Sequence, residues 1–415
     1  MTEPLSNWAG NLTYAAAAIH APRSIAEVQA IVRQARKVRA LGSRHSFNAI
    51  ADTDADLISL RHLNRVIAID AAARTVTIDG GITYGELAPV LDAAGFALEN
   101  LASLPHISVV GAVSTGTHGS GVGNRNLGAA VASLTFVDAT GELLTLSRGD
   151  PDFDGAVVAL GALGIVVTAT LDIVPRFEMR QDVYVGLSFA ALAENFEAVA
   201  GSAYSVSAFT HWHGDSVEMV WVKSRADAAP PPAELFGARP AGRPLHPISS
   251  LDPAPATEQL GVTGPWHERL PHFRMAFLPS VGAELQSEYF VPRADAAEAL
   301  RALHAIQHRI APVLLVSEVR TIAADSQWLS MCSGRDSLAF HFTFKPDWPA
   351  VSQVLPHVEA ALAGFGVRPH WGKLFTMPAR AVQGLYPRLG DFRTLLRRHD
   401  PAGKFRNGFI DTFIG

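Results

Sequence analysis

Residues 111–128 contain six glycines among mostly small polar residues. We predict that this segment belongs to a long loop beginning at Leu101, because glycine adopts backbone conformations that other residues avoid. Backbone N–H groups in such a loop can approach a ligand closely, which favours an anion-binding loop over a merely flexible surface loop. The segment contains neither G-x-G-x-x-G nor G-x-x-x-x-G-K-[ST], so it supports neither a Rossmann site nor a P-loop.

The patterns on both sides of this loop predict an α+β protein. Apolar residues at helical spacing, preceded by a capping box, predict a helix over 25–38. A short strand over 39–41 follows and ends in the polar turn 42–46. Strand and helix patterns then alternate, with a helix over 153–163, until Pro175 closes this first region.

The middle of the chain changes character. Residues 226–258 contain eight prolines, which predicts an extended surface loop or a partly ordered flap. Strand patterns over 285–291, 313–321 and 337–345, with helical patterns between and after them, predict a second, sheet-rich domain with covering helices.

Composition limits the partners and the compartment. The 415 residues include 34 Lys+Arg and 39 Asp+Glu, a net charge of −5 without a basic cluster, so we expect no nucleic-acid partner. Cys332 is the only cysteine, which excludes an intrachain disulfide and fits the cytoplasm. The first 21 residues lack the signal-peptide pattern, and the uncharged run 155–171, which is interrupted by glycines, falls short of the ~20 residues that span a bilayer, so we expect no membrane association.

His45 is the first candidate for chemistry. It lies in the turn 42–46 directly after a strand, where an imidazole can face a pocket and where Arg44 would help to keep it neutral. Neutral imidazole is the nucleophilic form of the side chain. A lone histidine in a turn is more often an ordinary surface residue, so spacing alone leaves a covalent role as the minority interpretation.

Two strand patterns each place polar side chains on one face. Glu318 and Arg320 project to the same side of a predicted strand, and His341, Thr343 and Lys345 alternate with phenylalanines in the next. An acid and a base on one surface could form part of a functional site. The same pattern is equally typical of the solvated outer face of an antiparallel sheet with a cross-strand ion pair.

The sequence His370-Trp371-Gly372-Lys373 follows a short strand and is either part of a site or a plain turn. We predict no metal site, because His267-Glu268 lacks a second histidine at the spacing of the zinc-helix motif. The chain also lacks G-x-S-x-G, the usual elbow of serine hydrolases.

Four motifs, taken in order, resemble the alditol oxidases, which are sugar-alcohol oxidases of the vanillyl-alcohol oxidase family of FAD-linked flavoproteins. These motifs are Leu41–Asn48, Ala102–Ser108, Gly116–Gly121 and Pro369–Lys373. The similarity extends over nearly the whole chain, from Asn7 to Phe405.

The resemblance implies a two-domain α+β flavoprotein of the vanillyl-alcohol oxidase type. An FAD-binding domain would occupy 1–175, a sheet-rich substrate (cap) domain 176–375, and a C-terminal segment, 376–415, would return to the FAD-binding domain. FAD would be attached covalently through His45. Positions matching those near FAD are Gly42, Ser43, Arg44, His45, Ser46, Ser103, Ser108, Gly111, Thr115, Gly116, Thr117, His118, Val166 and His370.

The same matching assigns the polyol site to Ser103, Glu318, Arg320, Thr343 and Lys373, with Arg320, Lys373 and Glu318 as its catalytic group. The implied activity is oxidation of the terminal hydroxyl of an alditol such as xylitol or sorbitol, with reduction of O2 to H2O2. The alternatives are an aldonolactone or other carbohydrate oxidase of the same family, and a non-catalytic binding relative. We expect a monomer with a small-molecule polyol and O2 as its partners.

Overall fold

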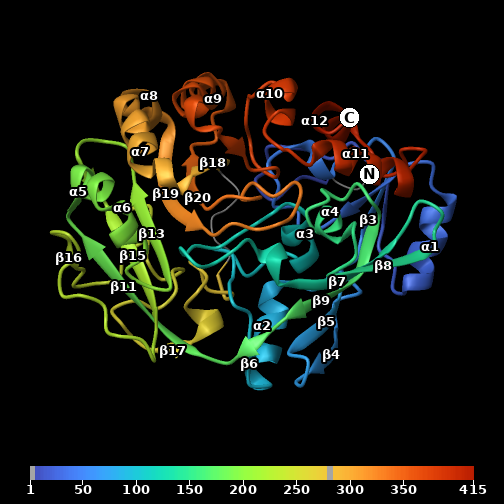
Figure 1. The fold of residues 1–415 in the computed structure, drawn as a ribbon, viewed down its shortest axis with the longest axis horizontal. Coiled ribbons are helices and arrows are strands. Elements are labelled where there is room, and N and C mark those ends of the chain that lie inside the picture. The colour runs from blue at the N-terminus through green and yellow to red at the C-terminus, as the bar shows by residue number, and fades with distance from the viewer. Residues whose placement is uncertain (1–4, 278–283) are drawn as a thin grey trace.

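The computed structural model describes residues 5–277 and 284–415. Residues 1–4 and 278–283, which belong to the two predicted domains, lie outside the described residues. Sheets and helices are both present, and Figure 1 shows the large sheet in one half of the molecule and the N-terminal elements in the other. Within the described ranges, no helix has the length and apolar character needed to cross a bilayer.

The N-terminal half contains a parallel sheet and an antiparallel sheet. The parallel sheet has the order β1 (Ala18–His20), β3 (Asp56–Ser59), β2 (Val38–Leu41). The antiparallel sheet has the order β4 (Val66–Asp70), β5 (Thr75–Asp79), β9 (Ile165–Asp172), β7 (Val131–Val137), β8 (Leu143–Ser147). Residues along β9 alternate between buried and partly buried, because one face of this sheet packs on the core.

The other half is built on a large antiparallel sheet. Its order is β16 (Arg239–Pro240), β11 (Glu178–Val185), β15 (Met219–Arg225), β13 (Ser205–Thr210), β19 (Leu314–Ile322), β20 (Ser337–Phe344), β18 (Leu285–Pro292), β21 (Arg368–Pro369), with β17 (Gly264–Pro265) beside β11. Two small antiparallel pairs join β10 (Val174–Pro175) to β6 (Phe96–Ala97) and β12 (Leu187–Ser188) to β14 (Ser216–Val217).

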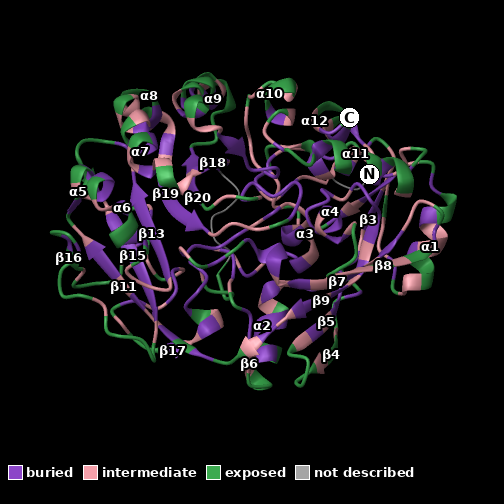
Figure 2. Cartoon of the chain, viewed as in Figure 1, coloured by how far each residue is buried: buried purple, intermediate pink, exposed green. Residues whose placement is uncertain are grey.

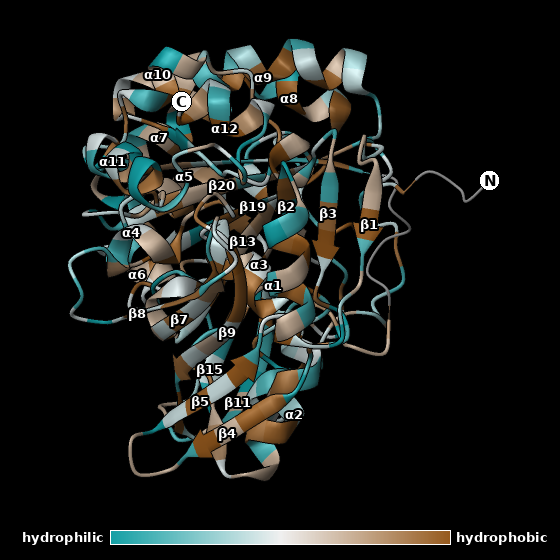
Figure 3. Cartoon of the chain, turned by 90° about the vertical axis from the view of Figure 1, so that its right-hand side faces the viewer, coloured by the Kyte–Doolittle hydropathy of each residue, from teal (hydrophilic) through white to brown (hydrophobic). Residues whose placement is uncertain are grey.

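Helices cover these sheets, with buried positions on their inner faces and exposed positions outside (Figure 2). Those of the N-terminal half are α1 (Ile25–Gln34), α2 (Tyr84–Ala93), α3 (Val109–Ser114) and α4 (Phe153–Val157). The large sheet is accompanied by α5 (Phe189–Glu194), α6 (Phe196–Ala200), α7 (Ala296–Ala305), α8 (Gln307–Ile310) and α9 (Trp348–Leu362). The chain ends with α10 (Ala379–Gln383), α11 (Leu389–His399) and α12 (Gly408–Phe413), which lie near the N-terminal elements (Figures 1 and 3).

Hydrogen bonds join the C-terminal segment to the N-terminal half. The Asn407 side-chain amide donates to the carbonyl oxygens of Ala49, Ile50 and Asp52 at 2.8–3.1 Å. The backbone N–H of Val38 donates to the carbonyl oxygen of Lys404 at 2.9 Å. The end of the chain thus supports β2, the strand that leads into the turn containing His45.

Three predicted elements differ from the structure. The helix predicted over 25–38 ends at Gln34, because Ala35 is already extended and Val38 begins β2. The helix predicted over 153–163 ends at Val157, and Leu160 has a left-handed φ of 56° that a helix cannot contain. The glycine-rich loop is partly helical, since α3 occupies Val109–Ser114.

Candidate active site

A cavity of about 670 Å³ lies between the N-terminal half and the large sheet. Its lining combines the turn after β2, loop and helix residues around α3, polar positions of β18, β19 and β20, and the loop after β21. The predicted site residues that line it are Gly42, Ser43, Arg44, His45, Ser46, Ser103, Ser108, Gly111, Thr115, Thr117, His118, Val166, Glu318, Arg320, Thr343, His370 and Lys373.

Gly116 is the predicted site residue that the structure places outside the cavity lining. Its φ is +70°, a conformation that favours glycine, and a Cβ atom there would lie 3.1 Å from the Cε atom of Met331. Gly116 therefore shapes the backbone between Thr115 and Thr117, whose side chains do face the cavity and whose hydroxyls are 3.2 Å apart.

One end of the cavity is formed where the turn after β2 packs against the start of α3. The Ser43 hydroxyl accepts a hydrogen bond from the Ser108 backbone N–H at 3.1 Å. A Cβ atom on Gly42 would lie 2.9 Å from the Ser108 hydroxyl oxygen, and one on Gly111 would lie 2.5 Å from it. A side chain at either position would press against the Ser108 hydroxyl, so glycine at both leaves room for it, and this end of the cavity is lined by small polar groups.

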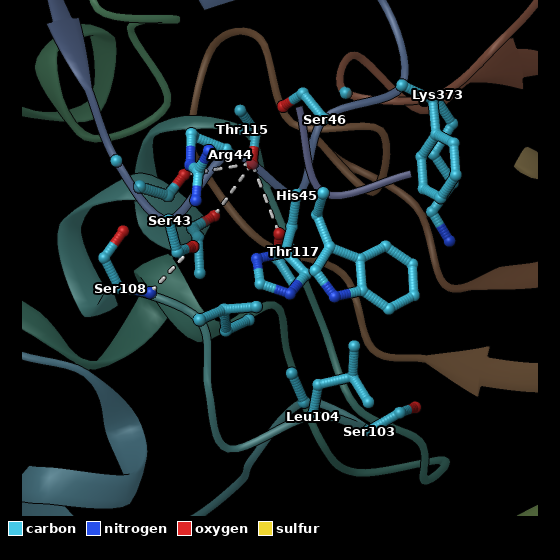
Figure 4. A pocket seen from close by; sticks show the side chains of 18 of the residues that line it. Ser43, Arg44, His45, Ser46, Ser103, Leu104, Ser108, Thr115, Thr117 and Lys373 are labelled. Carbon is cyan, nitrogen blue, oxygen red and sulfur yellow. Dashed lines mark hydrogen bonds between the residues drawn. The ribbon is translucent and has the colours of Figure 1, made fainter. Parts of the chain in front are cut away.

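His45 lies between this polar end and the opposite wall that carries Lys373 (Figure 4). Its ring stacks on Trp8, with centroids 5.2 Å apart and planes at 21°. Burial lowers the pKa of His45 to about 4, so the imidazole is neutral at physiological pH. Arg44 also lowers this pKa, as predicted, but it contributes less than burial does.

The residues present fit an FAD group. His45 lines the cavity, and its Nδ1 is buried with no hydrogen-bond partner among the described residues. Such a buried polar atom is costly unless a ligand satisfies it. The small polar residues around Ser43 and Ser108 leave room for a pyrophosphate beside backbone N–H groups.

The opposite wall of the cavity is the polar face that the sequence predicts on β19. Glu318 and Arg320 share this face, as predicted, but they are only 4% and 5% exposed. Their burial at a cavity wall excludes the alternative of a solvated outer sheet face. Burial raises the pKa of the Glu318 carboxyl, yet the charge of Arg320 and the hydrogen bond from His272 outweigh it and hold this pKa below its usual range.

Glu288 lies on β18, which is separated from β19 by β20, and it was not predicted from the sequence. Its carboxylate accepts a hydrogen bond from Nη2 of Arg320 at 2.6 Å and lies 2.9 Å from Nζ of Lys373. Nε2 of His118 is 3.2 Å away. Burial raises the pKa of Glu288, but the charges of Lys373 and Arg320 hold it well below its usual range. A glutamate inside a predicted apolar strand was the available signal, because a buried carboxylate requires cationic partners.

Lys373 reaches this wall from the loop after β21. The loop is held by the Asn48 side-chain amide, which donates to the carbonyl oxygens of Trp371 and Lys373 at 2.8 and 2.7 Å. Nζ of Lys373 lies 2.5 Å from Nδ1 of His341. Burial lowers the pKa of Lys373, while Glu288 opposes the shift. The sequence His370-Trp371-Gly372-Lys373 is therefore part of the cavity wall and not a plain turn.

Thr343 and Ser103 complete the polar wall. Oγ1 of Thr343 lies 3.2 Å from Nε2 of His341, and Oγ of Ser103 accepts a hydrogen bond from Nη1 of Arg320 at 3.2 Å. Lys345, the third polar residue in the predicted row, lies outside the lining and is exposed. Arg320, Lys373, Glu288, Glu318, Thr343 and Ser103 thus give this wall a pair each of cations, carboxylates and hydroxyls.

Two known protein families match the N-terminal and C-terminal parts of the chain. Residues 16–147 match the FAD binding domain family, and residues 283–413 match the D-arabinono-1,4-lactone oxidase family. The chain is 49% identical over 413 residues to the alditol oxidase of Streptomyces sp. (strain IKD472 / FERM P-14339), covering 99% of both chains. It is 32% identical over 430 residues to the L-gulono-1,4-lactone dehydrogenase of Mycobacterium tuberculosis, again covering 99% of both.

Among solved structures, a solvent-stable cholesterol oxidase and the cholesterol oxidase from B. sterolicum share the fold. Each matches with a TM-score of 0.81 and covers 100% of this chain and 97% of its own, at 18% and 16% identity.

Proposed function

The chain belongs to the vanillyl-alcohol oxidase family of FAD-linked oxidases, and from this membership we propose that it oxidises the terminal primary hydroxyl of an alditol to an aldose. The predicted family and the predicted α+β, two-domain flavoprotein fold are confirmed. The 49% identity to an alditol oxidase over the full chain supports the substrate class. The domain boundaries at 175 and 375, a monomeric state and a cytoplasmic location stay predictions.

The observation that carries this proposal is the convergence of Arg320 and Lys373 on Glu288 at one cavity wall. Oxidation of an alcohol removes a proton from its oxygen and a hydride from its carbon, and FAD, when bound, supplies the hydride acceptor. Arg320 and Lys373 contact the reacting hydroxyl and stabilise the negative charge that develops on its oxygen. Glu288 holds both cations in place because its two carboxylate oxygens are shared between them.

The remaining polar groups bind the rest of the polyol. Glu318, Ser103 and Thr343 supply spaced hydrogen-bonding groups on the same wall, as an open polyol with several hydroxyls requires. When several hydroxyls of the substrate are bound, its terminal carbon is held in one orientation. This positioning increases the rate of the reaction.

At the opposite end of the cavity, we propose that His45 carries FAD covalently. Its neutral, buried and unpartnered Nδ1 supports this role. Gly42, Ser43, Arg44, Ser46, Ser108, Gly111, Thr115, Thr117, His118, Val166 and His370 would line the bound cofactor, with Gly116 setting the backbone between two of them. Acid precipitation tests the bond: the pellet of wild type should stay yellow, and that of His45→Ala should be colourless.

Anaerobic stopped-flow reduction of the flavin by xylitol tests the polyol site. We expect Arg320→Ala and Lys373→Ala each to slow reduction by a factor of about 100 or more, since each removes one charge that stabilises the developing alkoxide. Lys345→Ala is the matched control, because Lys345 follows β20, the strand that carries Thr343, but is exposed and lies outside the cavity lining. Wild-type rates in both site variants would contradict the assignment.

We propose O2 as the electron acceptor, with H2O2 as the product. Peroxide formed per turnover, compared with reduction of an artificial dye, distinguishes an oxidase from a dehydrogenase. An aldonolactone is the second candidate substrate, favoured by the match of residues 283–413 to D-arabinono-1,4-lactone oxidase. A panel of alditols and aldonolactones assayed by flavin reduction decides between the two classes.

A further inference from the structure

His272 lines the cavity beside Glu318 and contacts two of the proposed substrate-binding residues. Its side-chain Nε2 is 2.7 Å from Oε1 of Glu318, and both side chains are buried. Its backbone N–H donates to the carbonyl oxygen of Ser103 at 3.0 Å. The hydroxyl of the same Ser103 accepts a hydrogen bond from Arg320. One residue therefore links a loop of the N-terminal half to the polar wall of the large sheet.

Lys223, on β15, determines how His272 is protonated. Nζ of Lys223 lies 2.7 Å from the carbonyl oxygens of Leu270 and Pro271 and 3.3 Å from Nδ1 of His272. Burial lowers the pKa of Lys223 well below its usual range, and the charge of Glu318 opposes this shift. The three acceptors around Nζ match the three N–H donors of the ammonium form. With Nδ1 accepting from Lys223, the proton of neutral His272 is on Nε2, where it is donated to Glu318.

The surroundings of the imidazole keep it neutral. The charged groups that face it are Lys223 on β15 and Glu318 and Arg320 on β19. The rings of Phe209 and Trp221 meet it edge to face, at centroid distances of 5.6 and 5.2 Å. Burial lowers the pKa of His272, the charges of Lys223 and Arg320 act in the same direction, and Glu318 opposes them.

We propose that His272 is a positioning residue for substrate recognition: held in one tautomer by Lys223, its side chain fixes the carboxylate of Glu318 while its backbone fixes Ser103. The spacing between these two substrate contacts is then set by a buried chain of contacts that does not itself need to touch the polyol. This inference rests on the proposed function insofar as Glu318 and Ser103 bind substrate hydroxyls.

Two substitutions of His272 separate the hydrogen bond from packing. His272→Phe keeps a planar ring against Phe209 and Trp221 but cannot donate to Glu318, whereas His272→Gln keeps an N–H donor near the position of Nε2. Loss of a hydrogen bond to a charged group corresponds to about a tenfold to hundredfold change. We expect the polyol KM of H272F to rise by about that factor, with kcat changed by less than threefold, and H272Q to recover most of the affinity.

His211→Phe is the matched control. Its Nδ1 lies 2.9 Å from Oε1 of Glu218, so it is also paired with a glutamate, but it does not contribute to the described cavity lining. This variant should keep the wild-type KM. A wild-type KM in H272F, or equal rises in H272F and H272Q, would overturn the proposal.

The pH dependence tests the part played by Lys223. Lys223→Met removes the donor and the positive charge that disfavour a proton on Nδ1, so the pKa of His272 should rise even though burial still lowers it. As the pH falls, log KM of the folded Lys223→Met variant should therefore depart from its neutral-pH value at a higher pH than in wild type, and an unchanged pH profile would contradict the role given to Lys223.

A crystal structure of flavin-loaded H272F provides a readout that needs no substrate. We expect the Glu318 carboxylate to turn from its wild-type position toward Arg320, and an unmoved carboxylate would overturn the positioning role. Failure of the proposed function looks different: wild type would not reduce its flavin with any alditol, while the displacement of Glu318 in H272F would still be observed.

Discussion

Glu288 shows how much of the polar wall depends on a single side chain. Its carboxylate is 1% exposed and lies within hydrogen-bond distance of Arg320, Lys373 and His118. Without Glu288, the two buried cations would repel each other and each would lack a counter-charge. The carboxylate therefore makes it possible for both cations to face one substrate oxygen.

Replacing Glu288 by Gln should destabilise the protein and slow the reaction together. Removing one partner of a buried ion pair costs about 3–5 kcal/mol, because the remaining charge stays buried without compensation. We expect a loss of that order in the free energy of unfolding, measured by urea denaturation, and at least a tenfold slower flavin reduction. Glu359→Gln is the control, since the buried Glu359 accepts hydrogen bonds from the neutral hydroxyls of Tyr289 and Thr376. A wild-type reduction rate in Glu288→Gln would show that the cations need no counter-charge.

Substitutions of Arg44 test the importance of the backbone conformation next to His45. Its φ of 64° lies in the left-handed region, which costs a non-glycine residue about 1 kcal/mol or more. Arg44→Gly removes that strain but loses the hydrogen bond from Nη1 to the Ser6 carbonyl oxygen, so its unfolding free energy should stay within about 1 kcal/mol of wild type. Arg44→Val should lose about 2 kcal/mol, because a β-branched residue fits this region poorly. Equal stabilities of the Gly and Val variants would contradict this account.

At the scale of helices and strands, periodicity predicted element types well and their ends less well. β18, β19 and β20 begin and end within one residue of their predicted bounds, because their β-branched and aromatic residues form a clear strand pattern. α3 was missed because Gly111 interrupts its apolar positions, and its stability comes from burying Val109, Ala112 and Val113 in the core. Local propensity does not include that tertiary contribution.

Local sequence patterns likewise predicted one part of the candidate site and missed another. Alternation along β19 was enough to place Glu318 and Arg320 on one face, because the side-chain period of a strand is fixed. Whether that face is buried depends on what covers it, and the covering groups include Lys373 and His272, about fifty residues away along the chain on either side. No local pattern contains this information, and the family resemblance supplied it for Lys373 but not for Glu288 or His272.

The proline-rich segment 226–258 is a second element whose role the sequence left open. It was predicted as a surface loop or flap, and most of it has neither helix nor strand. Part of it, including His246, Ile248 and Leu251, lines the cavity. The segment is therefore a wall of the site as well as a surface loop.

Limited proteolysis should reveal this wall. Leu251 is 50% exposed and lines the cavity, whereas Phe236, in the same segment, is 42% exposed and lies away from it. In His45→Ala, from which FAD can be removed, we expect added FAD to slow chymotryptic cleavage after Leu251 by about threefold or more and to leave cleavage after Phe236 unchanged, because binding orders the cavity wall. Mass spectrometry of the fragments gives both rates, and equal protection at the two sites would exclude a local effect.

For the molecule as a whole, the cavity forms where distant parts of the chain meet. The Asn48 side chain holds the loop of Lys373, and Asn407 holds the segment that begins at Ala49. These contacts join the N-terminal half, the large sheet and the C-terminal segment around one site. Histidines collect at this junction: His118 and His370 are buried, and His45 and His341 are partly buried. The stability of this junction must therefore depend on pH, because histidines kept neutral in the fold can take up protons when the chain unfolds.

His341 gives the direction and the range of that dependence. Burial and the nearby charge of Lys373 lower its pKa to about 4, against about 6.5 in an unfolded chain. Above pH 6.5 both states hold the ring neutral and its contribution to stability is complete. As the pH falls toward 4, the unfolded chain takes up a proton that the folded protein excludes, and stability is lost at up to about 1.4 kcal/mol per pH unit. We expect urea denaturation between pH 7 and pH 4.5 to show this loss, with a shallower slope for His341→Gln than for wild type. His213→Gln, which removes an exposed histidine, should keep the wild-type slope, and an unchanged slope in His341→Gln would assign the acid sensitivity to other groups.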